Sequence, residues 1–164
     1  MIVREMFRPG MRAYLVPLVA GVTLTLSAFL PWVTVGDQSR PGIPDVWALW
    51  VAGLGVIAAV LAALSMITRK NSRHPLLVVG LVALGIMVLS WRILPRSVTE
   101  RAASLSQANA IVEGGEAAAT PEALIGVGIY TGPVASAAIA LFGLTIVVKR
   151  VSRPYAVASR DDDV

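Results

Sequence analysis

Long apolar stretches alternate with short polar ones along this chain. No charged residue interrupts the run from Val46 to Thr68, and this run is long enough for a helix to cross the ~30 Å hydrocarbon core of a bilayer. Further apolar runs follow the same pattern. We therefore predict an all-α membrane protein, a four-transmembrane-helix up-down bundle, with spans at about 13–35, 46–68, 75–94 and 124–148.

The remaining stretches are polar. Residues 1–12 form a basic leader, and residues 149–164 form a tail that carries both signs of charge. A basic leader followed by an apolar run is also the pattern of a signal peptide, but the run at 13–35 is too long for one. We expect this first run to be retained as a span, so that residues 13–148 form one transmembrane domain.

The segment 95–123 is the longest polar stretch between spans. Ser97 and Glu100 match a helix capping box, and Gly114 supplies a stop signal. Between them lies a thin apolar stripe, interrupted by Asn109, that consists of Val98, Ala102, Leu105 and Val112. We predict a short helical extracytoplasmic cap between spans 3 and 4.

Small residues recur at helical spacing along every predicted span. In the span 46–68 they form one face, opposite a face of bulky side chains. Small faces let helix backbones approach each other closely in lipid. The positions that we expect to pack helix against helix are Gly21, Ala52, Gly55, Ala59, Gly80, Gly128, Gly132 and Gly143.

The exit of the first predicted span, from Ser27 to Val33, reads SAFLPWV. It resembles the exit of the first span in uncharacterised small bacterial four-span membrane proteins that carry a Leu-Pro-Trp motif there. The layout is also similar to that of claudins, which have four spans and a tryptophan after the first. The claudin motif Trp-Gly-Leu-Trp-Cys-Cys is missing, however, and the longest loop here is the second outer one. The resemblance implies a four-span fold.

The basic residues predict the orientation of the spans. The leader holds three of the 14 lysines and arginines, the hairpin at 69–73 holds three, and the tail holds four. The positive-inside rule then places both termini and the hairpin in the cytoplasm, and the segment 95–123 outside. Arginine outnumbers lysine, as is typical of GC-rich bacterial genomes, so we expect the bacterial inner (plasma) membrane. The net charge of +4 reflects topology and indicates no nucleic-acid partner.

All four tryptophans fall on the predicted outer side. One interpretation is a ligand-binding site in the outer leaflet, lined by Trp32, Trp47, Trp50 and Trp91, with Arg92 and Asp45 as polar anchors. The other is an ordinary aromatic belt, in which indole rings lie at headgroup depth. Belts usually occupy both sides of the membrane, so the asymmetry keeps the ligand interpretation open.

The chain is poor in reactive side chains. No ionisable residue lies near the centre of a predicted span, where ion-coupled transporters place such groups. The single histidine, His74, cannot supply the paired axial ligands of a membrane haem, and no carboxylate pair accompanies it. There is no cysteine and no phosphate-binding or metal-binding motif. We expect no enzymatic activity, no cofactor and no metal.

Rich packing faces without reactive groups favour a structural function. We predict a non-enzymatic accessory or scaffolding subunit of an inner-membrane complex, or a self-associating bundle. Its partners would be membrane lipid and other membrane-protein subunits or further copies of itself. The alternative is an outer-leaflet lipid- or quinone-binding protein that uses the tryptophan-rich side, and a third possibility is a small transporter.

Overall fold

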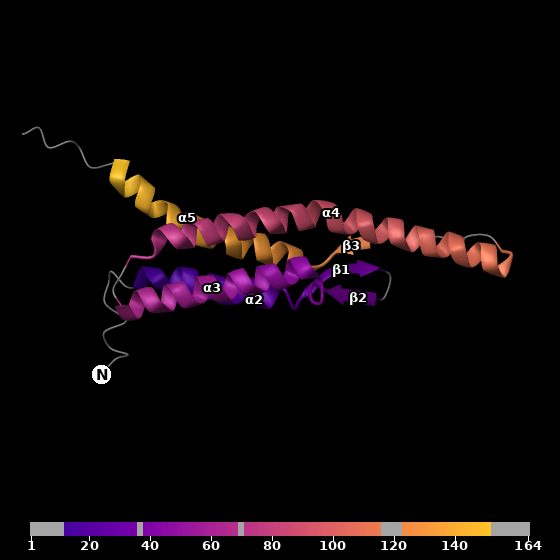
Figure 1. The fold of residues 1–164 in the computed structure, drawn as a ribbon, viewed down its shortest axis with the longest axis horizontal. Helices are drawn as coiled ribbons and strands as arrows, with labels where there is room; N and C mark the ends of the chain where they lie inside the picture. The colour runs from indigo at the N-terminus through magenta and orange to yellow at the C-terminus, as the bar shows by residue number, and fades with distance from the viewer. Residues whose placement is uncertain (1–11, 36–37, 69–70, 116–122, 152–164) are drawn as a thin grey trace, which may run out of the picture.

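The chain is mostly helical. The computed structural model describes residues 12–35, 38–68, 71–115 and 123–151; residues 1–11 of the leader, Arg69 and Lys70 of the hairpin, and the tail beyond Val151 lie outside them. The elements, in chain order, are η1 (Arg12–Tyr14), α2 (Leu15–Ser27), β1 (Pro31–Val35), β2 (Gln38–Pro41), α3 (Val46–Thr68), α4 (Arg73–Glu113), β3 (Ala123–Ile125) and α5 (Val127–Val151) (Figure 1).

Within the described ranges, three helices are long and apolar enough to cross a membrane. They are α3, a segment of α4 and a segment of α5. The helix α3 has 23 residues, about 35 Å of helix against the ~30 Å of hydrocarbon. The apolar helix at Arg12–Ser27 is shorter than these three.

The four α-helices of the described chain pack side by side. Each contacts two neighbours, in the order α2, α3, α4, α5 and back to α2. The faces turned inward are rich in small residues. In α3, for example, Ala48, Ala58 and Ala62 are fully buried, whereas Trp50 and Ile57 on the other side of the helix are exposed. The core between the helices is completed by Leu24, Val51, Leu76, Met87, Ile129 and Ile139.

The first apolar run does not stay helical to residue 35 as predicted. The helix α2 ends at Ser27, and Pro31–Val35 is the strand β1. Pro31 disfavours helical geometry at the residue before it, and the valines and threonine that follow it favour extended structure. The predicted first span is therefore a helix followed by a strand.

A small antiparallel sheet lies at one end of the bundle (Figure 1). It joins the segment between α2 and α3 to the residues just before α5. The strands lie in the order β2–β1–β3. On one side β1 pairs with β2, and on the other Val33 lies opposite Ile125 of β3. The fourth predicted span, expected from about residue 124, therefore begins as this strand, and its helix starts at Val127.

The predicted third span and the predicted cap helix form one continuous helix. The helix α4 has 41 residues and contains Pro95, so it is about 60 Å long, twice the thickness of the hydrocarbon core. Proline removes one backbone hydrogen bond, but Leu94 and Val98 on either side of it pack against the core, which offsets that loss. The helix ends where Gly114 adopts a left-handed conformation, with φ 68°. Its last turns project beyond the sheet (Figure 1).

Candidate functional site

The structure places Trp32 in the core. Its side chain is 1% exposed, and its indole N–H donates a hydrogen bond of 2.9 Å to the carbonyl oxygen of Ser27. Two glycines leave room for the ring, since a Cβ atom built on Gly42 or Gly128 would lie 2.5 Å from it. Trp32 therefore fixes the sheet to α2 and α5, and it is not open to a ligand.

The other predicted ligand-binding residues lie on the surface. The side chains of Trp47, Trp50 and Trp91 are 54%, 62% and 48% exposed. Among the described residues, the aromatic rings that contact each other are those of Tyr14 and Phe142, and neither residue belongs to the predicted site.

Asp45 and Arg92 act locally. The carboxylate of Asp45 accepts a hydrogen bond of 3.0 Å from the backbone N–H of Trp47, in the first turn of α3. Arg92 lies beside Arg96 and Glu100 on α4 itself. Of the six predicted residues, Trp32 is thus buried in the core, and the other five are exposed.

The predicted packing positions on α2 and α3 lie where these helices cross. A Cβ atom on Gly21 would lie 2.7 Å from the backbone nitrogen of Ala59, and one on Gly55 would lie 2.7 Å from that of Thr25. The hydroxyl of Thr25 donates to its own helix, at Gly21 O, and reaches the carbonyl oxygen of Ala52 on α3 at 3.4 Å. The backbones of α2 and α3 are thus in direct contact.

The glycines of α4 and α5 have similar places. A Cβ atom on Gly80 would lie 2.5 Å from the nitrogen of Ala140, and one on Gly143 would lie 2.6 Å from Cα of Leu77. Gly132 faces the side chain of Met87. These small residues serve contacts inside the chain, so they do not form a free surface for a partner.

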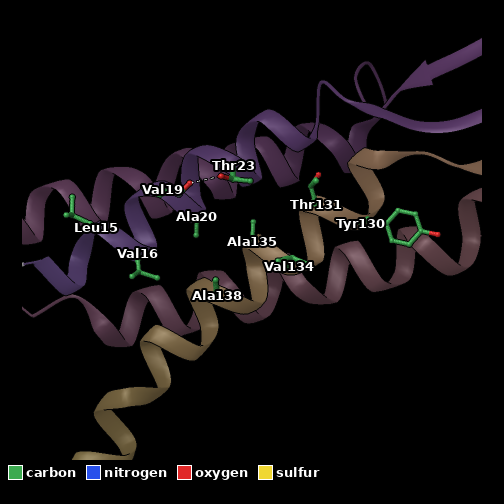
Figure 2. Close-up of a pocket in the computed structure, with 10 residues that line it drawn as sticks. All are labelled: Leu15, Val16, Val19, Ala20, Thr23, Tyr130, Thr131, Val134, Ala135 and Ala138. Atoms are coloured by element: carbon green, nitrogen blue, oxygen red, sulfur yellow. Dashed lines mark hydrogen bonds between the residues drawn. The ribbon is translucent and has the colours of Figure 1, made fainter.

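An apolar groove opens on the outside of the bundle between α2 and α5 (Figure 2). It has a volume of about 710 Å³, within the ~300–1,000 Å³ typical of small-molecule sites. Six of the residues that line it are Val16, Val19 and Thr23 on α2, and Tyr130, Val134 and Ala138 on α5. We call this site the α2–α5 groove.

The polar atoms of the α2–α5 groove are mostly satisfied within the helices. The hydroxyl of Thr23 donates to the carbonyl oxygen of Val19 at 2.9 Å. The hydroxyl of Thr131 lies 3.2 Å from the carbonyl oxygens of Val127 and Gly128. The groove therefore offers apolar contact and little hydrogen bonding. The residues that line the groove are far apart in the sequence, and only the packing of α2 against α5 brings them together.

A polar and aromatic cluster closes the opposite end of the bundle from the sheet. The hydroxyl of Tyr14 donates to Oδ1 of Asn71 at 3.0 Å, and its ring meets that of Phe142 edge-on at 5.0 Å. The guanidinium of Arg73 lies 5.5 Å from the centre of the Phe142 ring, a cation–π arrangement. His74 is exposed. Among the described residues, no group of three or more His, Cys, Asp or Glu could hold a metal ion.

Comparison of the chain with known protein families, with curated proteins and with solved structures finds no match. The geometry described above is therefore the basis for a functional proposal.

Proposed function

We propose that the chain is a four-span protein of the bacterial inner membrane. The spans would be η1 with α2, then α3, the first half of α4, and α5. Three of these helices have the length and hydropathy to cross. Residues Arg12–Ser27 form about 26 Å of helix, slightly less than the ~30 Å core. Their contacts with both α3 and α5 support a place within the same bundle.

The distribution of basic residues supports the orientation. Leader, hairpin and tail hold ten of the 14 lysines and arginines. The helix ends next to them, which are the start of α2, the end of α3, the start of α4 and the end of α5, lie at the end of the bundle opposite the sheet (Figure 1). The positive-inside rule puts this end in the cytoplasm. The sheet and the second half of α4 are then outside, where α4 extends for about 30 Å beyond the hydrocarbon.

We further propose that the protein is a non-enzymatic accessory or scaffolding subunit that docks through this second half of α4. We call residues 95–113 the α4 extension. The observation that carries the proposal is its exposed aliphatic surface. Leu105 and Val112 are 65% and 86% exposed, in a part of the chain that lies outside the membrane in this topology. Such side chains on a projecting helix favour contact with a partner.

The spacing of these residues favours a helical partner. Val98 packs against the core of the bundle. Beyond it, Leu105 and Val112 lie seven residues apart, and so do Ala102 and Asn109. They match the d and a positions of a heptad, with Asn109 as the polar a residue that sets register in coiled coils. Because the membrane orients every copy alike, two α4 extensions would meet in parallel. The partner is therefore a second copy or another subunit with a parallel outer helix.

Single-cysteine crosslinking tests this proposal, since the natural chain has no cysteine. We would place cysteine at Leu105 or Val112, and, as matched controls, at Ser104 or Ile111. Ile111 is as exposed as Val112 but lies about 100° around the helix. Oxidation in the native membrane should join two copies of the Leu105→Cys or Val112→Cys variant by a disulfide if the partner is a second copy. A benzophenone maleimide attached to the same cysteine needs no thiol on the partner, and on illumination it should crosslink the variant to another subunit, whose mass identifies it.

Equal crosslinking at Ile111 and Val112 would contradict the heptad interface. A lone chain in intact-complex mass analysis after gentle extraction, without any crosslink, would contradict the scaffolding function itself.

A further inference from the structure

We infer that the α2–α5 groove binds one acyl chain of a membrane lipid in the outer leaflet. This inference rests on the proposed four-span topology, because it needs the groove to lie in hydrocarbon. It assigns the lipid contact to a surface other than the tryptophan-rich side.

The position of the groove across the membrane follows from the ends of its two helices. The last turn of α2 and the first turn of α5 are level, because a Cβ atom on Gly128 would lie 2.7 Å from the carbonyl oxygen of Ser27. From Val127, the stretch Tyr130–Ala138 covers depths of about 5–17 Å along α5. From Ser27, the stretch back to Leu15 reaches about 18 Å along α2. The groove thus lies mainly in the leaflet on the side of the sheet, which is ~15 Å deep, and its inner end reaches the middle of the bilayer.

The length of the groove selects its occupant. The lining residues extend for about 12 Å along each helix, from the headgroup side to the middle of the bilayer. A transmembrane helix of a partner would need a contact surface along about 30 Å. A single acyl chain of one leaflet has the matching length, and its flexible, narrow shape fits an open groove.

The chemistry of the lining agrees with a hydrocarbon chain. The hydroxyls of Thr23 and Thr131 bond to carbonyls of their own helices, so a chain without polar atoms leaves no donor unpaired. Tyr130 is half exposed, and its ring extends from the groove toward the sheet end (Figure 2). Its hydroxyl is therefore on the headgroup side, where the amphipathic ring of tyrosine is stable. The groove accommodates the chain while Tyr130 meets the polar end of the lipid.

Photolabelling of the full-length protein in phosphatidylcholine vesicles tests the inference. The probe is a phosphatidylcholine that carries a diazirine in the middle of one acyl chain, and the labelled residues are located by mass spectrometry. Val19 and Val134 face the groove, whereas Leu89 and Val56 are exposed elsewhere on the bundle. A chain held between two helices makes more contacts than one on a smooth helix face, so we expect about tenfold more label on Val19 and Val134.

Matched variants separate the groove from general exposure to lipid. Thr23→Trp fills the groove from α2, and Val22→Trp places the same ring on the neighbouring exposed residue of α2. Ala138→Phe fills the groove independently from α5. The two filling variants should remove the excess label at Val134, and Val22→Trp should leave it unchanged.

Two results would overturn the inference. One is even labelling of Val19, Val134, Leu89 and Val56 in the natural chain. The other is a disulfide between two copies that carry cysteine at Val19, which would show protein in the groove. If the proposed four-span topology were wrong, the probe in the bilayer would label neither the groove nor the other exposed faces. That result differs from both of the results that overturn the groove inference.

Discussion

Gly21 on α2 and Gly55 on α3 face each other with their backbones in contact. A Cβ atom built on Gly21 would lie 2.8 Å from the carbonyl oxygen of Gly55, and one built on Gly55 would lie 2.8 Å from the carbonyl oxygen of Gly21. The relationship is reciprocal, so neither helix can accept a side chain without moving the other. Close backbone approach of this kind replaces the hydrophobic effect as the source of helix association in lipid.

Alanine at either glycine should destabilise the bundle. Gly21→Ala or Gly55→Ala forces α2 and α3 apart, and we expect the free energy of unfolding in detergent to fall by about 1–3 kcal/mol. Gly53→Ala is the matched control, because a Cβ atom there would have nothing within 4 Å. It should leave stability unchanged or raise it by up to about 1 kcal/mol through helix propensity. Equal effects of all three substitutions would show that α2 and α3 do not cross at this point.

The same argument gives a prediction for the contact between α4 and α5. A Cβ atom on Gly80 would lie 2.5 Å from the backbone nitrogen of Ala140, whereas one on Gly85 would meet nothing within 4 Å. Gly80→Ala should therefore lower the free energy of unfolding by about 1–3 kcal/mol, and Gly85→Ala should not. Denaturant titration of the two variants beside the natural chain measures the difference. A neutral Gly80→Ala variant is incompatible with the packing described here.

Trp32 should behave as a structural residue. Trp32→Phe removes the hydrogen bond to Ser27 and leaves a buried carbonyl without its partner, at a cost of about 1–3 kcal/mol in stability. Trp50→Phe changes a side chain that is 62% exposed and should stay within about 0.5 kcal/mol. Thermal unfolding in detergent compares the two. If Trp32→Phe left stability intact but released a bound lipid, Trp32 would belong to a ligand site instead.

The sequence predicted the helical class well because its signals are local. Uncharged runs located the stretches that α3, α4 and α5 use, and small residues at helical spacing marked the faces that the structure turns inward. Gly21, Gly55 and Gly80 are examples whose contacts come from neighbouring helices. These features follow from hydropathy and from the period of the helix alone.

The features that the sequence missed depend on distant partners. The strand β3 forms because β1 offers it a free edge, and Pro95 stays inside α4 because Leu94 and Val98 pack against the core. The sequence predicts Trp32 at the membrane interface, whereas the structure buries it with Gly42 and Gly128 against its ring. The α2–α5 groove likewise exists only once those two helices are neighbours. Tertiary contact overrides local preference in each case.

The central claim is that α4 crosses the membrane and continues outside it as one helix. His74 and Gln107 are exposed residues near its two ends, about 50 Å apart along the helix, so they would lie on opposite sides of the bilayer.

Labelling of single cysteines at these two positions with a membrane-impermeant maleimide tests the claim most directly. In intact spheroplasts, His74→Cys should react only after permeabilisation and Gln107→Cys should react without it. Reaction of both cysteines from the same side, or the reverse order, would contradict the crossing of α4 or its orientation.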